Sequence, residues 1–293
     1  MSVMDNVGGQ AVMEGVMMRS GNYVVTSVRN PKGKIVFRGG KMSTISKRLP
    51  FKLPFVRGIV VLFESLVVGM RSLNYSAEVA SGKKGQKSSG SDVVLAVLSF
   101  VFAFAIAIAL FKFVPLVLAQ LASRFSASLE NRFAFNALEG LIKLAIFVGY
   151  IALISRMKDI KRVFQYHGAE HKAINCFEAK KRLTVGNAGK FSTLNPRCGT
   201  SFLLFVIFIS IVVYIFIPMG FSFWAKFGLR LLLLPVIAGV SYEMIKLASR
   251  YPRNILFHAV SAPGLWMQRM TTKEPDDRQL EVALFSLKKV INK

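Results

Sequence analysis

Residues 165–202 read QYHGAEHKAINCFEAKKRLTVGNAGKFSTLNPRCGTSF and separate two long apolar parts of the chain. This polar stretch contains both cysteines, two of the three histidines and two carboxylates. Side chains of these types bind metals and transfer protons, so their concentration in one stretch indicates a functional site. We therefore interpret the rest of the chain as the structure that holds this stretch.

The composition is typical of a membrane protein. Hydrophobic residues make up 53% of the 293 residues, and the mean hydropathy is +0.47. Both values are too high for an ordinary soluble domain. The formal net charge of +24 favours anionic partners, such as lipid headgroups, RNA or an acidic protein surface.

Four apolar runs outside the polar stretch predict about four transmembrane helices, because a span requires roughly 20 mostly apolar residues. The second and fourth runs contain charged residues near their ends, and the fourth is interrupted by a proline and a glycine. The predicted spans are Val93–Leu121, Leu138–Ile154, Phe202–Ile217 and Phe227–Leu247.

The distribution of basic residues predicts the orientation in the membrane. Segments 1–91, 155–198 and 246–293 together contain 33 of the 39 lysines and arginines. The positive-inside rule places these segments, and with them both termini, in the cytoplasm of a bacterial inner membrane. The polar stretch then lies in a reducing compartment, where a cysteine is a thiol or a metal ligand.

The predicted fold class is a mainly α membrane protein with a small N-terminal β-containing unit. A hairpin is expected around the Asn30–Gly33 turn, because β-prone runs lie on both sides of it. Residues 55–80 predict a helix too polar in its middle to span the membrane, lying at the interface or re-entering it. The predicted organisation is a cytoplasmic unit at 1–54, that helix at 55–80, a flexible basic linker at 81–91, a four-span bundle at 92–247 with a cytoplasmic loop at 155–198, and a basic tail at 248–293.

The most specific motif is His167-Gly168-Ala169-Glu170-His171, which has the form H-x-x-E-H. On a helix, residues four apart lie on one face, so both imidazoles can reach a single ion. Glu170 lies close to that face, where it can act as a general base. This order is found in inverted zincins, in which two histidines bind zinc and the glutamate activates water. The competing interpretations are a hydrogen-bonded polar cluster and a solvated helix surface.

A zinc site with two histidines requires at least one further ligand. The two cysteines give a closed structural site with four ligands, whereas a single carboxylate leaves a position open for catalysis. The motif does not choose between these arrangements. The candidates are Cys176, Glu178, Cys198 and Glu243.

Four motifs together resemble the YqhQ-like family of bacterial integral membrane proteins. They are GGQAVMEGVMMR, YHGAEHKAINCFE, PRCGTSF and EPDDRQLEVAL, and they are spread over the length of the chain. The family is commonly labelled a predicted metal-dependent enzyme, and the resemblance implies the same here. It also implies that functional residues include Glu14, Arg19 and Arg197, in addition to His167, Glu170, His171, Cys176 and Cys198. For Glu14 and Arg19, a local ion pair is the alternative to a place in the site.

Three function classes follow from these observations. The first is a zinc-dependent hydrolase at the membrane surface. The second is a non-catalytic membrane factor whose basic cytoplasmic face docks on a ribosome, a translocon or anionic lipid, with a second copy of the chain as a further expected partner. The third is a transporter, which ranks last because the apolar runs have few charges and no inverted repeat. Those charged residues are Lys112, Glu139, Lys143, Arg230 and Glu243.

Overall fold

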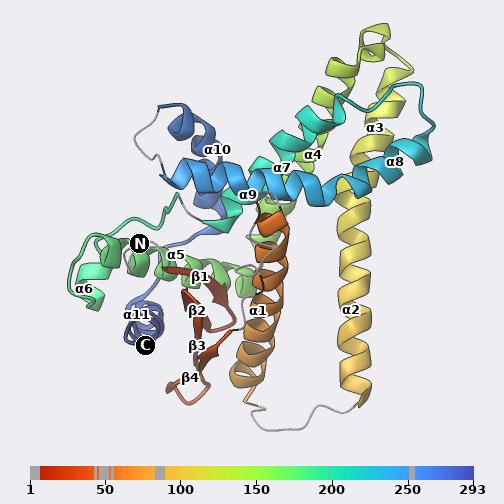
Figure 1. Cartoon of the computed structure of the whole chain (residues 1–293). Helices are drawn as coiled ribbons and strands as arrows, with labels where there is room; N and C mark the ends of the chain where they lie inside the picture. Colours follow the sequence, from red (N-terminus) through yellow and green to blue (C-terminus); the bar gives the residue numbers. More distant parts are fainter. Residues whose placement is uncertain are drawn as a thin grey trace.

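A computed structural model describes residues 7–42, 45, 53, 56–82, 90–196, 198–250 and 255–293. These residues form a mainly helical protein with one four-stranded antiparallel sheet near the N-terminus (Figure 1). The predicted fold class is confirmed in this respect. The sheet and the helices packed on it lie apart from the tips of α3, α4 and α8, which gather at the upper right of Figure 1.

The sheet is a meander in the order β1-β2-β3-β4. The predicted hairpin is present as β3 and β4, with Arg29 opposite Ile35. The first two strands were not predicted from the sequence. The central residues of β2 are buried on both sides of the sheet, so the alternation of polar and apolar residues that marks a half-exposed strand is absent. The strands are β1 (Val7–Val12), β2 (Gly15–Ser20), β3 (Tyr23–Arg29) and β4 (Ile35–Lys41).

Helices cover both faces of the sheet. On one face lies α1 (Val56–Ala80), the helix predicted over residues 55–80, which buries Tyr75 against the strands. On the other face lie α5 (Lys158–Glu178) and α11 (Asp277–Ile291), which share one apolar cluster with β2 and β3. The predicted basic tail therefore ends in a helix, α11, whose apolar face packs against the sheet.

The apolar helices provide fewer long spans than predicted. By length and composition, two helices among the described residues can cross a membrane, Val97–Ser123 and Arg132–Ile154. A third exists if α8 (Phe223–Leu232) and α9 (Leu234–Arg250), bent by 43° at the break between them, count as one span. The predicted third span is α7 (Gly199–Tyr214), whose 16 residues extend only about 24 Å at 1.5 Å each.

The long first span has three consecutive parts. It begins as α2 (Gly90–Ile108), passes through a π-helical turn at Ala109–Phe113 and continues as α3 (Val114–Ser123). The chain then turns back into α4 (Arg132–Ile154). After α9, the helix α10 (Ile255–Thr271) leads back to the sheet and to α11. The polar stretch therefore lies where the helical part of the protein meets the sheet.

Candidate metal centre

The motif helix α5 is fastened to the sheet and to the chain that follows α10. The carboxylate of Glu14, in the turn between β1 and β2, accepts hydrogen bonds from the guanidinium of Arg162. The hydroxyl of Tyr166 donates to the same carboxylate at 3.3 Å. On another side of the helix, the backbone N–H of Lys273 donates to the carbonyl of Phe164 at 2.9 Å. These contacts position the turn of α5 that carries the histidines.

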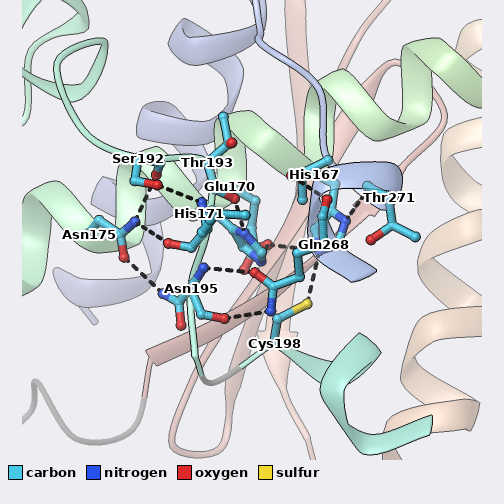
Figure 2. A network of polar contacts seen from close by, with 12 residues as sticks. His167, Glu170, His171, Asn175, Ser192, Thr193, Asn195, Cys198, Gln268 and Thr271 are labelled. Carbon is cyan, nitrogen blue, oxygen red and sulfur yellow. Dashed lines mark hydrogen bonds and ion pairs between the residues drawn. The ribbon is translucent and has the colours of Figure 1, made fainter. Parts of the chain in front are cut away.

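Both histidines of the motif are oriented by backbone carbonyls. Nδ1 of His167 lies 2.9 Å from the carbonyl oxygen of Thr271, and Nδ1 of His171 lies 2.5 Å from that of Thr193 (Figure 2). A carbonyl oxygen can only accept, so each Nδ1 carries the proton and donates it. In the neutral form of each ring Nε2 is then the unprotonated nitrogen, and this is the form that binds metals.

Cys198, the residue before α7, completes the group. Its Sγ lies 3.2 Å from Nε2 of His167, and one ligand atom from each of His167, His171 and Cys198 lies within 4.8 Å of the others. The ligands of a tetrahedral zinc ion lie roughly 3.3–3.5 Å apart, given bonds of about 2.0 Å to nitrogen and 2.3 Å to sulfur. The His167–Cys198 pair already has this spacing, and the group of three could hold a metal ion if the remaining separations shorten.

Glu170 lies beside the two imidazoles. Its Oε2 is 3.6 Å from Nε2 of His171 and 4.0 Å from Nε2 of His167. Burial raises the pKa of Glu170 to about 7, against the opposing influence of His167. The carboxylate reaches this place because Gly9 of β1 lacks a side chain. A Cβ at Gly9 would lie 2.7 Å from both Cγ and Oε1 of Glu170.

Three amides hold the loop before Cys198 in place. The side chain of Gln268 exchanges two hydrogen bonds with the backbone of Asn195, at 2.9 and 2.8 Å. The amide of Asn195 donates to Asn175, whose own amide donates to the carbonyls of residues 192 and 194 (Figure 2). Sequence reasoning missed all three. Only Asn175 had a detectable signal, since it follows His171 by one helical turn and lies on the same face.

Gly168 allows the chain after α10 to cross the motif helix closely. A Cβ at this position would lie 2.1 Å from the carbonyl oxygen of Lys273, a distance that packed atoms cannot adopt. The close approach brings the carbonyl of Thr271 to Nδ1 of His167. The glycine inside the H-x-x-E-H motif is therefore needed for the orientation of the first histidine.

The group formed by His167, His171 and Cys198 borders a cavity of about 420 Å³. Its floor is one face of α5, with His167, Glu170 and His171 between apolar residues. Strand β1 also lines the cavity, as do Asn195 and Cys198. Three protein ligands and an adjoining cavity leave room for water or a substrate, as catalytic zinc sites require.

Three predicted ligands lie outside this group. Cys176 belongs to the apolar cluster beneath α5, where its thiol lies 3.7 Å from the carbonyl oxygen of Arg182. It follows His171 by five residues and so lies on another face of the helix. Glu178 ends α5 seven residues after His171, a rise of about 10 Å. Glu243 of α9 forms an ion pair with Arg57 of α1.

The remaining candidates have other partners. Glu14 pairs with Arg162 rather than with Arg19. Glu14 directly precedes β2 and Arg19 lies near the end of this extended strand, so the two residues are far apart. Arg19 donates to the carbonyl of Gly21 at 3.1 Å. Glu14 contributes to the site indirectly, since it anchors α5. Arg197 lies outside the described residues.

Comparisons with known proteins place these features in a family context. The family described as "Protein of unknown function (DUF1385)" matches residues 53–293. The chain is also 38% identical, over 299 residues, to "Uncharacterized protein YqhQ" of Bacillus subtilis (strain 168), covering 97% of this chain and 92% of that protein. No solved structure matches the chain significantly. Neither description names a reaction, so the function has to be argued from the site.

Proposed function

Because the chain belongs to the family described as Protein of unknown function (DUF1385), we propose its function from its geometry. We propose that it is a zinc-dependent hydrolase of the bacterial inner membrane. The observation that carries the proposal is the convergence of His167, His171 and Cys198, with both Nδ1 atoms bound to backbone carbonyls. This arrangement directs two lone pairs and a thiol to one point at the edge of a cavity.

The donor set fits zinc. Imidazole nitrogen and thiolate sulfur are its usual protein ligands, and histidines that bind metals commonly donate their other N–H to a carbonyl or carboxylate. A zinc ion bound here would polarise a carbonyl group and lower the pKa of a water molecule. Glu170, beside both imidazoles, is placed to accept a proton from water in the cavity.

A cysteine and a histidine 3.2 Å apart also match a thiol nucleophile and its base. Such a pair needs a single imidazole, oriented by a third group. Here a second imidazole, that of His171, and a carboxylate lie next to the pair. The His171 ring is oriented, like that of His167, by a hydrogen bond from Nδ1 to a backbone carbonyl. The extra groups favour a metal site over a thiol nucleophile.

Elemental analysis of the detergent-purified protein tests the metal site. We expect about one zinc per chain in the wild type and its loss in Cys198→Ser and His171→Ala proteins, because each removes one of three ligands. Cys176→Ser is the matched control, since this cysteine faces the apolar cluster, and it should keep its zinc. Wild-type protein without metal would refute the proposal.

Insertion in the membrane is the second part of the proposal. It is supported by the two long apolar helices, or three with the bent pair, and by the basic segments that favour cytoplasmic termini. Retention of the protein in membranes after an alkaline carbonate wash checks the insertion. Accessibility of a cysteine introduced at each terminus checks the orientation.

A second candidate function is docking on anionic lipid headgroups. A cavity of about 460 Å³ between the sheet and α1 has three exposed cations in its lining, Arg38, Lys41 and Arg71. We expect binding to phosphatidylglycerol vesicles that weakens with salt and falls in the Lys41→Gln/Arg71→Gln protein. Co-sedimentation of the detergent-purified protein measures it. Binding to ribosomes, and not to vesicles, would assign the basic face to RNA instead.

A further inference from the structure

The strand β1 is an edge of the sheet, since it pairs only with β2 among the described residues. A two-residue turn joins the strands and places Val12 opposite Gly15. In an antiparallel pair, alternate residues direct their backbone groups to the partner and away from it. The N–H and C=O groups of Val7, Gly9 and Ala11 therefore point away from β2, and no other strand of the described structure pairs with them.

This outer edge borders the candidate metal centre. The cavity with the metal group is lined by Val7–Ala11 of β1. A second cavity of about 350 Å³ lies along the same strand and is lined by Gly8, Gln10, Arg19 and Ser65 among others. Side chains of an extended chain alternate between two sides, so a strand added to β1 would find a cavity for each set.

Gly8 keeps the second cavity open. A Cβ at Gly8 would meet nothing within 4 Å, and the residue is exposed. Packing within the described residues therefore does not require a glycine there, in contrast to Gly9, which makes room for Glu170. A larger side chain at Gly8 would project into the second cavity and narrow it.

We propose that an extended peptide segment pairs with the outer edge of β1 and that peptides are the substrate class of the site. The inference rests on the proposed hydrolase. Main-chain hydrogen bonds supply the affinity in such pairing, and side-chain cavities supply selectivity. The apolar floor formed by Val163, Phe164 and Ile174 selects an apolar residue beside the peptide bond that is cleaved.

The reaction at this bond is hydrolysis. The oxygen of a water molecule bonds to the peptide carbonyl carbon, and Glu170 accepts one proton of that water. The carbon–nitrogen bond breaks, and the proton passes from Glu170 to the leaving nitrogen. The products are a carboxylic acid and an amine, which exchange one further proton to become a carboxylate and an ammonium group, and no oxidant or reductant takes part.

The test measures binding and not only cleavage. Zinc-loaded full-length protein carrying Glu170→Gln is titrated into fluorescein-labelled ten-residue peptides with leucine at position five and mixed residues elsewhere, and anisotropy reports binding. Adding Gly8→Val should weaken binding about tenfold or more, the equivalent of at least ~1.4 kcal/mol. Gly40→Val is the matched control, because Gly40 lies on the other edge strand and its Cβ would also meet nothing within 4 Å.

A second measurement separates edge pairing from a folding defect. One peptide of the pool is N-methylated at each position in turn. Each methyl group that removes a hydrogen bond to β1 should weaken binding about two- to tenfold, and the sensitive positions should alternate with insensitive ones. Alternation is the signature of a strand, and a general loss of affinity would not produce it.

The outcomes are distinct. Equal binding by the Gly8→Val and Gly40→Val proteins, or N-methyl effects without alternation, overturns the peptide inference even if zinc is bound. Failure of all the peptides to bind does the same. Absence of zinc from the wild-type protein overturns the proposed hydrolase, and peptide cleavage at this edge with it, whatever the binding assay gives.

Discussion

Replacing Glu170 with glutamine is expected to lower the rate of hydrolysis by about 10²–10⁴-fold, the usual contribution of a general acid–base group. The carboxylate lies beside both imidazoles and is buried. Glutamine keeps the size and the hydrogen-bonding oxygen, but its neutral amide cannot act as a general base. The measurement is kcat/KM for a chromogenic ester or for a peptide identified by binding, with zinc content determined on the same samples.

The matched control is Glu178→Gln on the same helix. Glu178 lies two turns beyond His171, outside the group of ligand atoms, and its replacement should leave the rate within about twofold. Loss of zinc from the Glu170→Gln protein would give Glu170 a different role, as a fourth ligand. Full activity of a zinc-loaded Glu170→Gln protein would exclude it as the proton acceptor.

The sequence was sufficient to predict the core of the candidate site. The spacing of His167, Glu170 and His171 defines a helix face, and helical geometry alone brings the three together. The sequence did not decide which cysteine joins the histidines. Cys198 is separated from the motif by a loop, and the path of that loop depends on tertiary contacts. The helical period argues against Cys176, since five residues after His171 correspond to a different face of the helix.

The groups that orient the histidines could not be predicted. Both partners of the Nδ1 atoms are backbone carbonyls. Every residue has such a carbonyl, whatever its side chain. Residue type therefore gives no signal for them. The anchor of α5 is similarly hidden, because Glu14 pairs with a residue 148 positions away and local spacing pointed to Arg19 instead.

The apolar runs predicted helices well and spans less well. Hydropathy measures how apolar a segment is. An apolar helix can be buried against other helices of the protein as well as in lipid, so high hydropathy does not by itself indicate a span. The segment from Phe202 to Tyr214 is apolar but short, and the segment from Phe223 to Leu247 breaks at Leu233, before Pro235. Proline has no backbone N–H and is tolerated in the first turn of a helix but not in its interior, which accounts for the start of a new helix, α9, one residue before Pro235.

Three charged residues of these helices form one connected group. Arg230 of α8 donates to the carboxylate of Glu139 on α4, with a closest distance of 2.6 Å, and to the amide oxygen of Asn136. Lys143 lies 3.5 Å from the same carboxylate. The side chains of Arg230, Glu139 and Lys143 are at most 4% exposed. One buried carboxylate thus serves two buried cations.

Replacing Glu139 with glutamine is expected to destabilise the protein by about 3–5 kcal/mol, because breaking a buried ion pair leaves an uncompensated charge. Two cations lose their carboxylate here, so the upper part of this range applies. Thermal unfolding in detergent measures the effect. Glu130→Gln, in an exposed turn before α4, is the control and should remain within about 0.5 kcal/mol of the wild type.

A further variant separates lost charge compensation from lost packing. Replacing Glu139, Arg230 and Lys143 together with leucine or methionine removes every charge of the group and keeps most of its volume. Such replacements are often neutral or stabilising, so the triple variant should be more stable than Glu139→Gln alone. If both variants are equally destabilised, the group contributes through its shape and its hydrogen bonds to Asn136, and the carboxylate is not what compensates the two cations.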